Sequence, residues 1–564
     1  MDNLAKNLKQ DLNDLFSRNM EGFLVPDTKK QKVFISLTDG LKRAATFVGS
    51  GNTMETAFSA ARSKALKQIT GIESAPKWIS MAFVSEEESI SKDELYKEFA
   101  ATKKHYYRSG LALDEDYQFA FLEQEINGSG LIKYGAETGP PTLHDHNITY
   151  FLRRRRLIDR LFVFSEKDLG PVIKFRTKSC FYDIQEKQYH DLYDGGLEKG
   201  IRVTDSLDAG ALTDLAEKSG AYLKSTAMDD GRFVYGYFPV FDREIQAYNA
   251  IRHCLSVMAL MEIYKLTKDE SYVETIRKTY AYFMDQYYIE IDAETAVIVD
   301  KENEDEIRLG SLGLSLVAMQ MYAELFGADA GITEKAVRIA NTICTLQDDT
   351  GQFTHVLQYP DMSVKEKFRI VYYSGEACYG LMKLYAATKD EKYLSTVKKA
   401  FEFFIDNRYD KYYDHWLSYS VNELVQYAPE DRYFEFGLKN ATNKLDFIID
   451  RLTTWPTFLE MLNAASGMVA QIKALGKEKL LENYDMDKFG EALTARLFRQ
   501  LNGVLFPEMA MYYGNPDKML YGVFIRHHYF RVRDDDVAHH LIGYCHFVKN
   551  VLPGYKDGVA RREG

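Results

Sequence analysis

Two short segments of the sequence combine the residue types that transfer protons. Asp414-His415-Trp416 places a carboxylate, an imidazole and an aromatic ring in consecutive positions. Asp536 and His539 are three residues apart, which puts both side chains on one face of a helix. An imidazole that a carboxylate orients is a common general acid or base near neutral pH. We therefore predict that Asp414, His415, Asp536 and His539 are catalytic.

These segments also have a purely structural interpretation. Asp414 and the run Asp534 to Asp536 each precede an apolar helical pattern, and aspartate is a preferred N-cap residue. In that alternative, His415 and Trp416 pack between helices. Replacing Asp414 or His539 by alanine would then reduce stability, whereas a catalytic residue would lose turnover with little change in melting temperature.

Glu376 is the fifth predicted catalytic residue. It lies among small and apolar residues, and an unpaired buried charge is costly, so this carboxylate must be paired or functional. Tyr373 precedes it by three residues and shares its helix face. We predict that Tyr373 and Trp416 form walls on which a sugar ring or a peptide stacks.

Several basic side chains lie at the starts of the apolar helical segments. A guanidinium fork is suited to binding a carboxylate or a phosphate. The remaining predicted substrate-binding residues are Arg252, His253, Arg308, Arg526 and Arg531.

The sequence predicts neither a metal nor another cofactor. The pair His144 and His146 lies in a stretch rich in glycine and proline, which is typical of a polar loop. Histidine and aspartate near His539 are normal metal ligands, but no second histidine pair completes a set. The five cysteines are scattered and contain no CxxC spacing, which argues against a zinc site and a disulfide framework.

The elements that must position these residues are helical from about residue 206 onward, and they repeat. The segment from Thr267 to Tyr272 recurs from Thr388 to Tyr393, with a weaker echo from Ala428 to Tyr433. In each, the aspartate stands where it would cap the next helix. Six very apolar helices alternate with six amphipathic ones. The apolar set is 247–266, 309–326, 372–387, 414–427, 457–474 and 535–550, and the amphipathic set is 208–226, 270–288, 332–347, 391–408, 430–450 and 486–501.

Helices that are apolar on all sides are buried, so this alternation predicts an inner ring of six and an outer ring of six. The last helix is as apolar as the other inner ones, which favours a closed ring over an open solenoid. The fold prediction is an α+β domain at 1–205 and an all-α (α/α)6 toroid at 206–564. Strands are expected at 33–37, 44–48, 78–84, 160–165 and 172–182, and N-terminal helices at 92–101 and 117–126.

The inner-helix openings resemble those of six-hairpin toroid proteins. The segments that carry the resemblance are Leu309–Leu316, Tyr373–Ala377 and Asp414–Trp416. Such toroids occur in N-acylglucosamine 2-epimerases, unsaturated glucuronyl hydrolases, glucuronyl C5-epimerases and lanthionine-synthetase cyclases. The resemblance covers about residues 206–552 and matches no diagnostic catalytic motif of a single family. It implies a fold and a cleft, and the Cys/His zinc site of the cyclases is absent from this sequence.

The composition limits the classes of binding partner that we expect. The net charge is −12, so we expect no nucleic acid and no anionic membrane as a partner. No apolar stretch is long enough to suggest a membrane span, and the polar segment that begins at Met1 lacks a targeting core. We expect a cytoplasmic protein and assign no oligomeric state.

The leading functional prediction is an enzyme that acts on a carbohydrate or glycan precursor by acid/base catalysis in the toroid funnel. Hydrolysis, elimination and epimerisation all fit. Two alternatives stay open: an enzyme that modifies a peptide or amino-acid polymer, and a non-catalytic scaffold of a surface-polymer assembly system.

Overall fold

The computed structural model describes residues 2–28, 30–69, 75–135, 139–159, 161–327, 330–555 and 558–561. The chain forms two compact units. Unit 1 comprises Met1–Thr204, Tyr237–Arg243 and Asn502–Val532, and unit 2 comprises Asp205–Gly236, Glu244–Leu501 and Arg533–Gly564. One boundary follows Thr204, but the two later segments of unit 1 fall within the range that the sequence analysis assigned to the helical part.

Unit 1 is built on a seven-stranded antiparallel sheet. The strand order is β2-β1-β3-β8-β4-β5, and β9 pairs with β8. The strands are β1 (Gln31–Thr38), β2 (Ala45–Gly51), β3 (Trp78–Ile90), β4 (Gly110–Ala112), β5 (Ala120–Phe121), β8 (Val172–Asp183) and β9 (Gln188–Asp191).

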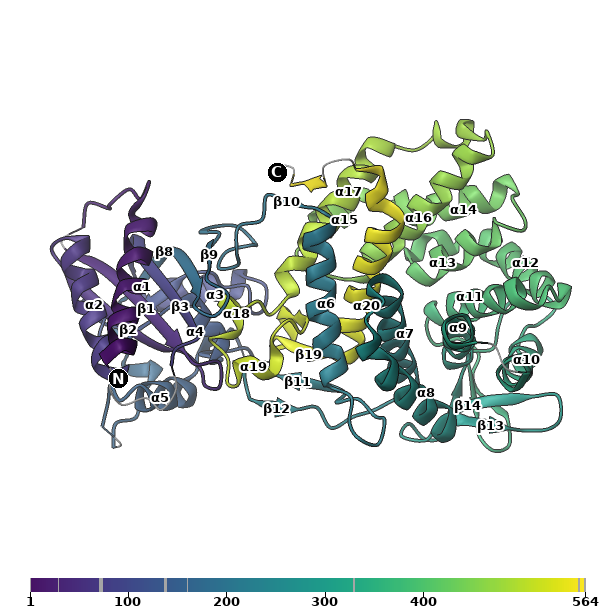
Figure 1. Ribbon diagram of the computed structural model, residues 1–564, viewed down its shortest axis with the longest axis horizontal. Helices are drawn as coiled ribbons and strands as arrows, with labels where there is room; N and C mark the ends of the chain where they lie inside the picture. The colour runs from purple at the N-terminus through teal and green to yellow at the C-terminus, as the bar shows by residue number, and fades with distance from the viewer. Residues whose placement is uncertain are drawn as a thin grey trace. The chain divides into compact units, whose positions relative to one another are not determined.

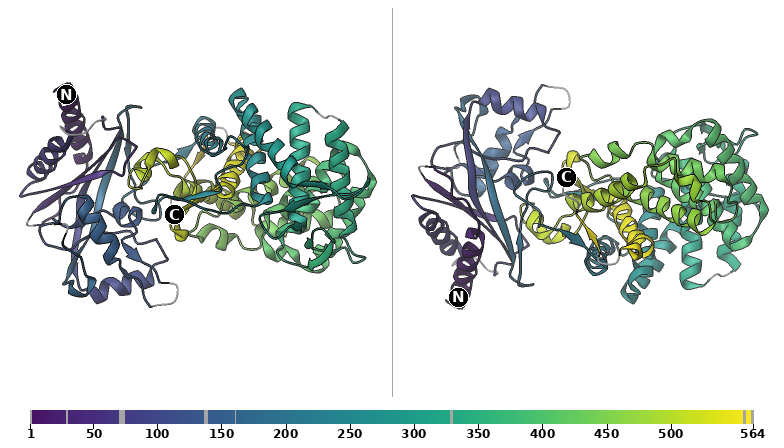
Figure 2. Two further views of the ribbon diagram at one scale, coloured as in Figure 1. Left: turned by 90° about the horizontal axis from the view of Figure 1, so that it is seen from below. Right: turned by 90° about the horizontal axis from the view of Figure 1, so that it is seen from above.

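Both faces of this sheet are covered, because successive side chains of a strand point to opposite sides. Val33 and Ile35 of β1 pack with α1 (Asp2–Met20) and α2 (Met54–Ile69), which lie on the same side of the sheet (Figures 1 and 2). Phe34, between them, belongs to a second apolar cluster that includes residues 511 and 512 of the third segment of unit 1.

The shorter elements of unit 1 differ in part from the prediction. The helix expected at 117–126 is wrong, because β5 occupies its middle and α4 (Glu123–Gly128) begins only afterwards. The strand expected at 160–165 is also wrong for its described part, since 161–165 contains no strand. The helix at 92–101 is confirmed as α3 (Lys92–Ala101), which a capping box between Ser91 and Glu94 starts. A further helix of unit 1, α5, spans Asp145–Arg154.

Unit 2 is mainly helical, as predicted. Six helices contact one another in sequence order, and the last of them contacts the first again. They are α7 (Ala250–Thr267), α9 (Leu309–Phe326), α11 (Tyr372–Thr388), α13 (His415–Leu424), α16 (Thr457–Ala474) and α20 (Asp534–His546). Their central position explains their composition: α9, for example, is buried at every residue from Leu309 to Met319. Figure 1 shows α7 and α20 side by side.

Amphipathic helices pack against these six from outside. The helix α6 contacts both α7 and α20, and each of the others contacts its neighbour in the chain. They are α6 (Ala209–Ser225), α8 (Val273–Tyr287), α10 (Ala330–Thr345), α12 (Glu391–Asp406), α14 (Asp431–Thr442) and α17 (Met486–Arg499). The helix predicted at 430–450 is divided into α14 and α15 (Leu445–Asp450).

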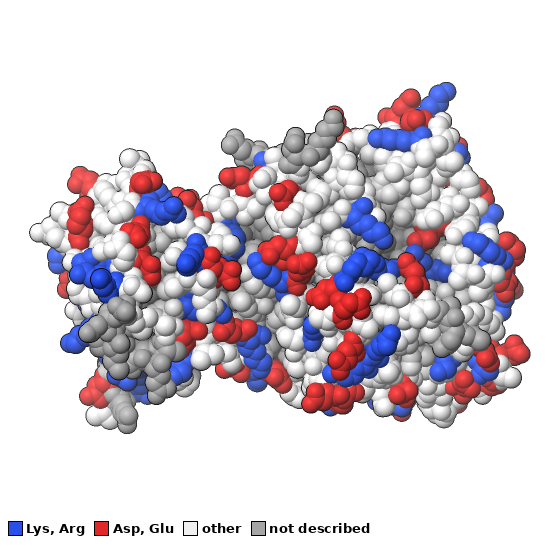
Figure 3. All heavy atoms as spheres, viewed as in Figure 1, with Lys and Arg blue, Asp and Glu red and all other residues white. Residues whose placement is uncertain are grey.

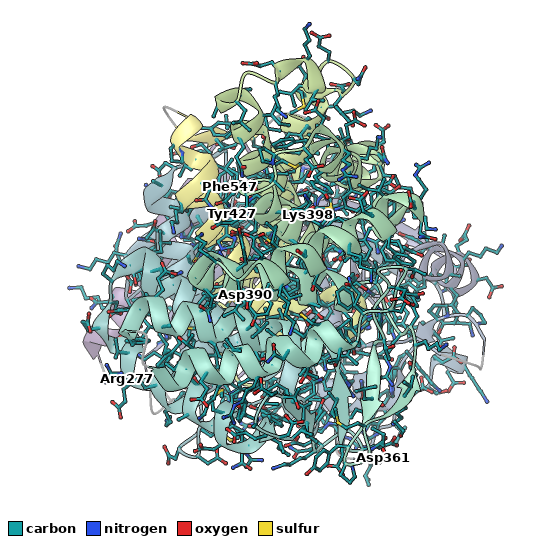
Figure 4. The ribbon with its side chains drawn as sticks, turned by 90° about the vertical axis from the view of Figure 1, so that its right-hand side faces the viewer. Arg277, Asp361, Asp390, Lys398, Tyr427 and Phe547 are labelled. Atoms are coloured by element: carbon teal, nitrogen blue, oxygen red, sulfur yellow. The ribbon has the colours of Figure 1, made fainter. Side chains whose placement is uncertain are left out.

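The repeated segment has the same local structure at its first two occurrences. Lys268 and Lys389 both end a helix in the left-handed conformation, with φ of 57°. Asp269 and Asp390 then act as N-caps, and Asp390, labelled in Figure 4, caps α12. In the third occurrence the prediction is wrong, because Asp431 is already helical and its neighbour at the N-cap makes no side-chain bond.

Unit 2 also contains a small antiparallel sheet that the sequence analysis did not predict. It joins the loops between the helices in the order β13-β14-β15-β16-β17. The strands are β13 (Tyr288–Glu290), β14 (Ala296–Asp300), β15 (Glu306–Arg308), β16 (Val356–Gln358) and β17 (Ser363–Glu366). This sheet leads directly into α9.

Among the described residues, α9 is the one helix long and apolar enough to cross a membrane. The expectation that no stretch reaches this length is therefore wrong for α9. Two thirds of the helix is buried, and it packs against α7, α10 and α11, as a core helix does. On the face seen in Figure 3, acidic and basic side chains are interspersed over the described surface.

Candidate functional site

His415 is the first residue of α13, and its neighbour holds it in place. The Asp414 carboxylate is the N-cap of α13 and accepts hydrogen bonds from the backbone N–H groups of residues 416 and 417, at 3.0 and 3.3 Å. Asp414 Oδ1 also lies 3.3 Å from His415 Nδ1. The Asn440 amide donates to the Asp414 backbone carbonyl at 2.8 Å, so the helix start is anchored to α14. The capping interpretation of Asp414 is thus confirmed, and the carboxylate orients the imidazole as well.

His539, on α20, is held by a different carboxylate. Its Nδ1 lies 2.7 Å from Glu460 Oε1, and Glu460 Oε2 accepts a hydrogen bond from the Tyr419 hydroxyl at 2.9 Å. Burial alone would lower the pKa of His539, but the Glu460 carboxylate raises it above the ordinary value. Burial alone would raise the pKa of Glu460, but His539 holds it below the usual range. The arrangement favours an imidazolium–carboxylate pair.

The imidazole rings of His415 and His539 are in edge-to-face contact within one cluster. Their ring centroids are 5.1 Å apart with an interplanar angle of 78°. The Trp416 ring packs 4.7 Å from His415 and 6.1 Å from His539. His415 Nε2 is buried and has no hydrogen-bond partner among the described residues, whereas His539 is partly exposed. One imidazole nitrogen is therefore unengaged beside a second imidazole that carries a raised pKa.

Tyr419 connects the pair of Glu460 and His539 to two further polar side chains. The Tyr419 hydroxyl also lies 3.2 Å from His546 Nδ1, and His546 Nε2 lies 3.6 Å from Glu262 Oε2. These groups come from α13, α20 and α7, so the interior of the helical unit is polar along this line. Tyr419 and Glu460 are buried, and their polar atoms are satisfied by one another.

Glu376 lies close to this cluster but does not join it. Its side chain is buried on α11, next to Gly310 of α9, and Oε2 has no hydrogen-bond partner in the described part of the chain. Burial raises the pKa of Glu376 well above the ordinary value, and the Asp414 charge adds to this. Burial of Glu376 thus favours the neutral, protonated form of its carboxyl group. Tyr373 is buried beside it, with its ring 5.6 Å from that of His355.

Asp536 is not the partner of His539. The Arg533 guanidinium binds both oxygens of Asp536, at 3.1 and 3.3 Å, and also contacts Asp535 at 3.0 Å. Asp535 in turn binds Arg252 Nε at 2.8 Å. These charges form a network at the start of α20, in which Arg252 and Asp536 are already paired.

Two other predicted substrate-binding residues are engaged inside the fold. His253 is fully buried, with Nδ1 2.7 Å from the Tyr248 hydroxyl and Nε2 2.8 Å from a backbone carbonyl. Burial lowers its pKa to about 4, so it is a neutral core histidine. Arg308 binds Asp300 and Glu306 at 2.9 and 2.8 Å, and these partners belong to the small sheet.

Arg526 and Arg531 belong to unit 1 rather than to the helical unit. Arg526 is buried, while Arg531 lies on β19 (Arg531–Arg533). In the same unit, His144 caps α5 by accepting a hydrogen bond from the backbone of residue 147 at 3.5 Å. The loop predicted around His144 and His146 is therefore a helix start.

The sequence analysis missed Glu460 and Tyr419. Glu460 lies in an apolar run, between Leu459 and Met461, and so carries the same signal that drew attention to Glu376. Tyr419 shares a helix face with His415, four residues before it. A search for every ionisable residue within the six apolar helices would have found Glu460.

The site also offers a set of metal-ligand atoms. One donor atom from each of His415, Glu460 and His539 lies within 4.8 Å of the others. Two imidazoles and a carboxylate are ordinary ligands of divalent transition metals. Asp414, next to His415 Nδ1, would orient that imidazole.

No protein-family model matches the sequence, and neither does any curated protein. Solved structures are similar at low identity. D-mannose isomerase shares 12% identity with a TM-score of 0.46, over 60% of this chain and 96% of that one. Cellobiose 2-epimerase from Bacillus thermoamylovorans B4167 shares 11% identity with a TM-score of 0.45, over 61% and 100%. An unsaturated glucuronyl hydrolase specific for heparin shares 10% identity with a TM-score of 0.42, over 60% and 97%. These matches have TM-scores below 0.5 and assign no family to this chain.

Proposed function

We propose that unit 2 is an (α/α)6 toroid whose histidine pair, His415 and His539, transfers protons on a carbohydrate substrate. The observation that carries this proposal is the facing arrangement of the two imidazoles, 5.1 Å apart, each beside its own carboxylate. The cyclic contacts of the six inner helices support the toroid. The substrate class follows the expectation from the sequence, and the cytoplasmic location is part of the same proposal.

The protonation states suit a two-base reaction. Glu460 stabilises a protonated His539, and His415 has an unengaged Nε2. His415 would remove a proton from the carbon next to the carbonyl group of an open-chain sugar, which leaves an enediolate. His539, in contact with His415 and therefore on the same side of the substrate, would return a proton to the neighbouring carbon. The reaction is then an isomerisation.

Hydrolysis fits the geometry less well. A glycoside hydrolase of the usual kind needs one carboxylic acid and one carboxylate on either side of the scissile bond. Here Glu460 is bound by His539 and Tyr419, Asp414 caps a helix, and Glu376 lies in the core. The histidines are the groups left to exchange protons with a substrate.

Hydrogen–deuterium exchange tests the proposal directly. The protein is incubated in D₂O with a panel of free aldoses, ketoses and reducing disaccharides, and proton NMR follows the carbons next to the carbonyl. We expect deuterium at one of them together with a new isomer. His415→Gln and His539→Gln should each abolish exchange, while His146→Gln, at an exposed histidine of unit 1, should not. Exchange that survives both site substitutions would contradict the assignment.

The cluster of His415, Glu460 and His539 favours one second candidate, a metal-dependent reaction at the same place. In that case, chelation should abolish activity and a divalent metal should restore it. Under the leading proposal, chelation leaves deuterium exchange unchanged. Metal analysis of the purified protein, before and after chelation, separates the two.

A further inference from the structure

Unit 1 contains a buried cluster of cations that its own carboxylates do not neutralise. Arg526, on the short helix after β18 (Phe524–Ile525), is 6% exposed, and Lys199 is 5% exposed. Arg108 lies beside them with 18% of its side chain exposed. The carboxylate within the cluster is Glu123, which is 4% exposed. Arg108 pairs with Glu123, and the charges of Lys199 and Arg526 interact with the same carboxylate.

The hydrogen bonds of the cluster leave specific atoms unused. Arg108 Nη1 binds Glu123 Oε1 at 2.5 Å, and Arg108 Nη2 donates to the backbone carbonyls of residues 197 and 199. Lys199 Nζ donates to the backbone carbonyl of Arg108 at 2.7 Å. Arg526 Nη1 and Glu123 Oε2 are buried and have no partner among the residues that the structure describes.

Arg526 is surrounded by aromatic rings instead of carboxylates. Its guanidinium lies 5.0 Å from the Phe530 ring centroid and 5.6 Å from those of Tyr106 and Phe524. Burial lowers the pKa of Arg526 to about 10, and the Arg108 charge contributes to this. Rings offer only weak compensation for a buried charge, so the cluster lacks a negative group.

The backbone around this place is held in an unusual conformation. His105, Tyr529 and Phe530 have φ values of 64°, 58° and 55°, in the left-handed region that non-glycine residues rarely occupy. The His105 ring contacts the rings of Tyr529 and Phe530, at 4.6 and 5.7 Å. Such conformations persist where the surrounding structure enforces them, and they are enriched at ligand sites.

We propose that this cluster is a binding site for a small oxyanion that carries a hydroxyl group, such as hydrogen phosphate or the carboxylate end of a hydroxy acid. The anionic oxygen accepts a hydrogen bond from Arg526 Nη1 and compensates the buried positive charge. The ligand hydroxyl donates to Glu123 Oε2. Both unused atoms are then satisfied, and the assignment does not depend on the reaction proposed for unit 2.

Calorimetric titration of the full chain tests the site, at constant ionic strength set with sodium chloride. Inorganic phosphate, sulfate and glycerate are the three probes. Phosphate and glycerate can donate a hydroxyl to Glu123, whereas sulfate carries no proton at neutral pH. We expect one phosphate or one glycerate per chain, and about tenfold weaker binding of sulfate because it repels Glu123. The tighter of phosphate and glycerate identifies the acid group.

Two substitutions locate the binding. Arg526→Gln should weaken binding by about tenfold or more, because a charge-assisted hydrogen bond is lost. Arg18→Gln is the matched control, since Arg18 is an exposed arginine on α1 of the same unit. It should bind like the unmodified chain. Absence of binding by all three probes, or equal binding by Arg526→Gln, would overturn the proposal.

A third variant covers the case in which Arg526→Gln does not fold. Glu123→Gln keeps the shape of the side chain but can donate to the ligand as well as accept from it. It should abolish the preference for phosphate over sulfate. A preference that survives in Glu123→Gln would refute the predicted contact with Oε2 and with it the site.

Discussion

Two glutamates of unit 2 are both buried, but their pKa values shift in opposite directions. Glu376 on α11 is 4% exposed and Glu460 on α16 is 0% exposed. Around Glu460, a histidine and a tyrosine donate to both carboxylate oxygens, which keeps the group ionised. Around Glu376, a glycine of α9 leaves room for the side chain but supplies no donor to Oε2, and burial raises the pKa of the group, which favours its protonated form. Burial alone does not decide the charge of a carboxyl group; its hydrogen-bond donors do.

Glu460→Gln should have the largest effect on the free energy of unfolding, because it removes the ionised one of the two glutamates. Removing one partner of a buried charge pair costs about 3–5 kcal/mol, and His539 can release its proton to reduce this to about 2–3 kcal/mol. At about pH 5, Glu376→Gln replaces a neutral acid by a neutral amide, so we expect a change of less than about 1 kcal/mol there. Urea unfolding of both variants measures the difference. Similar losses in the two would show that the environments are not distinct.

Gly310→Ala tests the packing of the neutral acid and should rank second. A Cβ at this position would overlap the Glu376 carboxylate, and overpacking of this kind costs about 1–3 kcal/mol. If the clash is with this side chain, the loss in Gly310→Ala should be smaller in a Glu376→Ala background. A double-mutant cycle by thermal unfolding measures the coupling. Additive effects would mean that the added methyl meets other atoms.

The pH dependence of stability should differ between the two sites. The raised pKa of Glu376 means that its contribution is present below the ordinary value of 4.5 and is lost as pH rises. Glu376→Gln should therefore gain stability relative to the unmodified chain as pH increases from 5 to 8. Denaturant midpoints across this range give the slope, and a flat difference would contradict a neutral Glu376.

The charge pair behaves differently, because its two members are lost at opposite ends of the scale. The lowered pKa of Glu460 makes its contribution present above 4.5 and lost as pH falls. The raised pKa of His539 makes its contribution fully present below 6.5 and lost as pH rises through the folded value. The advantage of the unmodified chain over Glu460→Gln should then be greatest between these values and decline on both sides.

Asp536→Asn should have the smallest effect. Its carboxylate is bound by Arg533, and its influence on His539 is through charge. We expect a loss of about 1 kcal/mol or less and a deuterium exchange rate within about threefold of the unmodified chain. Complete loss of deuterium exchange in a folded Asp536→Asn protein would show that Asp536 is catalytic.

The sequence was most informative where one periodicity decides the structure. The helices at 309–326 and 457–474 have the predicted bounds, because an all-apolar run bounded by polar residues has one way to be buried. The small sheet from β13 to β17 was not predicted, because its strands have three to five residues and depend on partners from other loops. The region at 117–126 was wrong for the same reason: two residues pair with β4 there.

The site could be predicted in its residue types but not in its pairings. Asp414 and His415 are neighbours in the chain, so their association was readable. The partner of His539 is 79 residues away on another helix, and spacing within α20 suggested Asp536 instead. Contacts between helices that are far apart in the sequence depend on tertiary packing. Local periodicity contains no information about such contacts.

The contact of α20 with α6 and α7 has a consequence for how the chain acquires its structure. Arg252 and Asp535, which bind each other, are 283 residues apart in sequence. Contacts of such separation form late, because the entropy of closing a long loop is lost before the contact is gained. A chain emerging from the ribosome therefore carries an open arc of helices with the apolar flank of α7 uncovered. The pair of Glu460 and His539 cannot form until α20 has been made, because His539 follows Glu460 by 79 residues. Truncation within the last helix should yield a chain that aggregates during synthesis rather than a folded protein without activity.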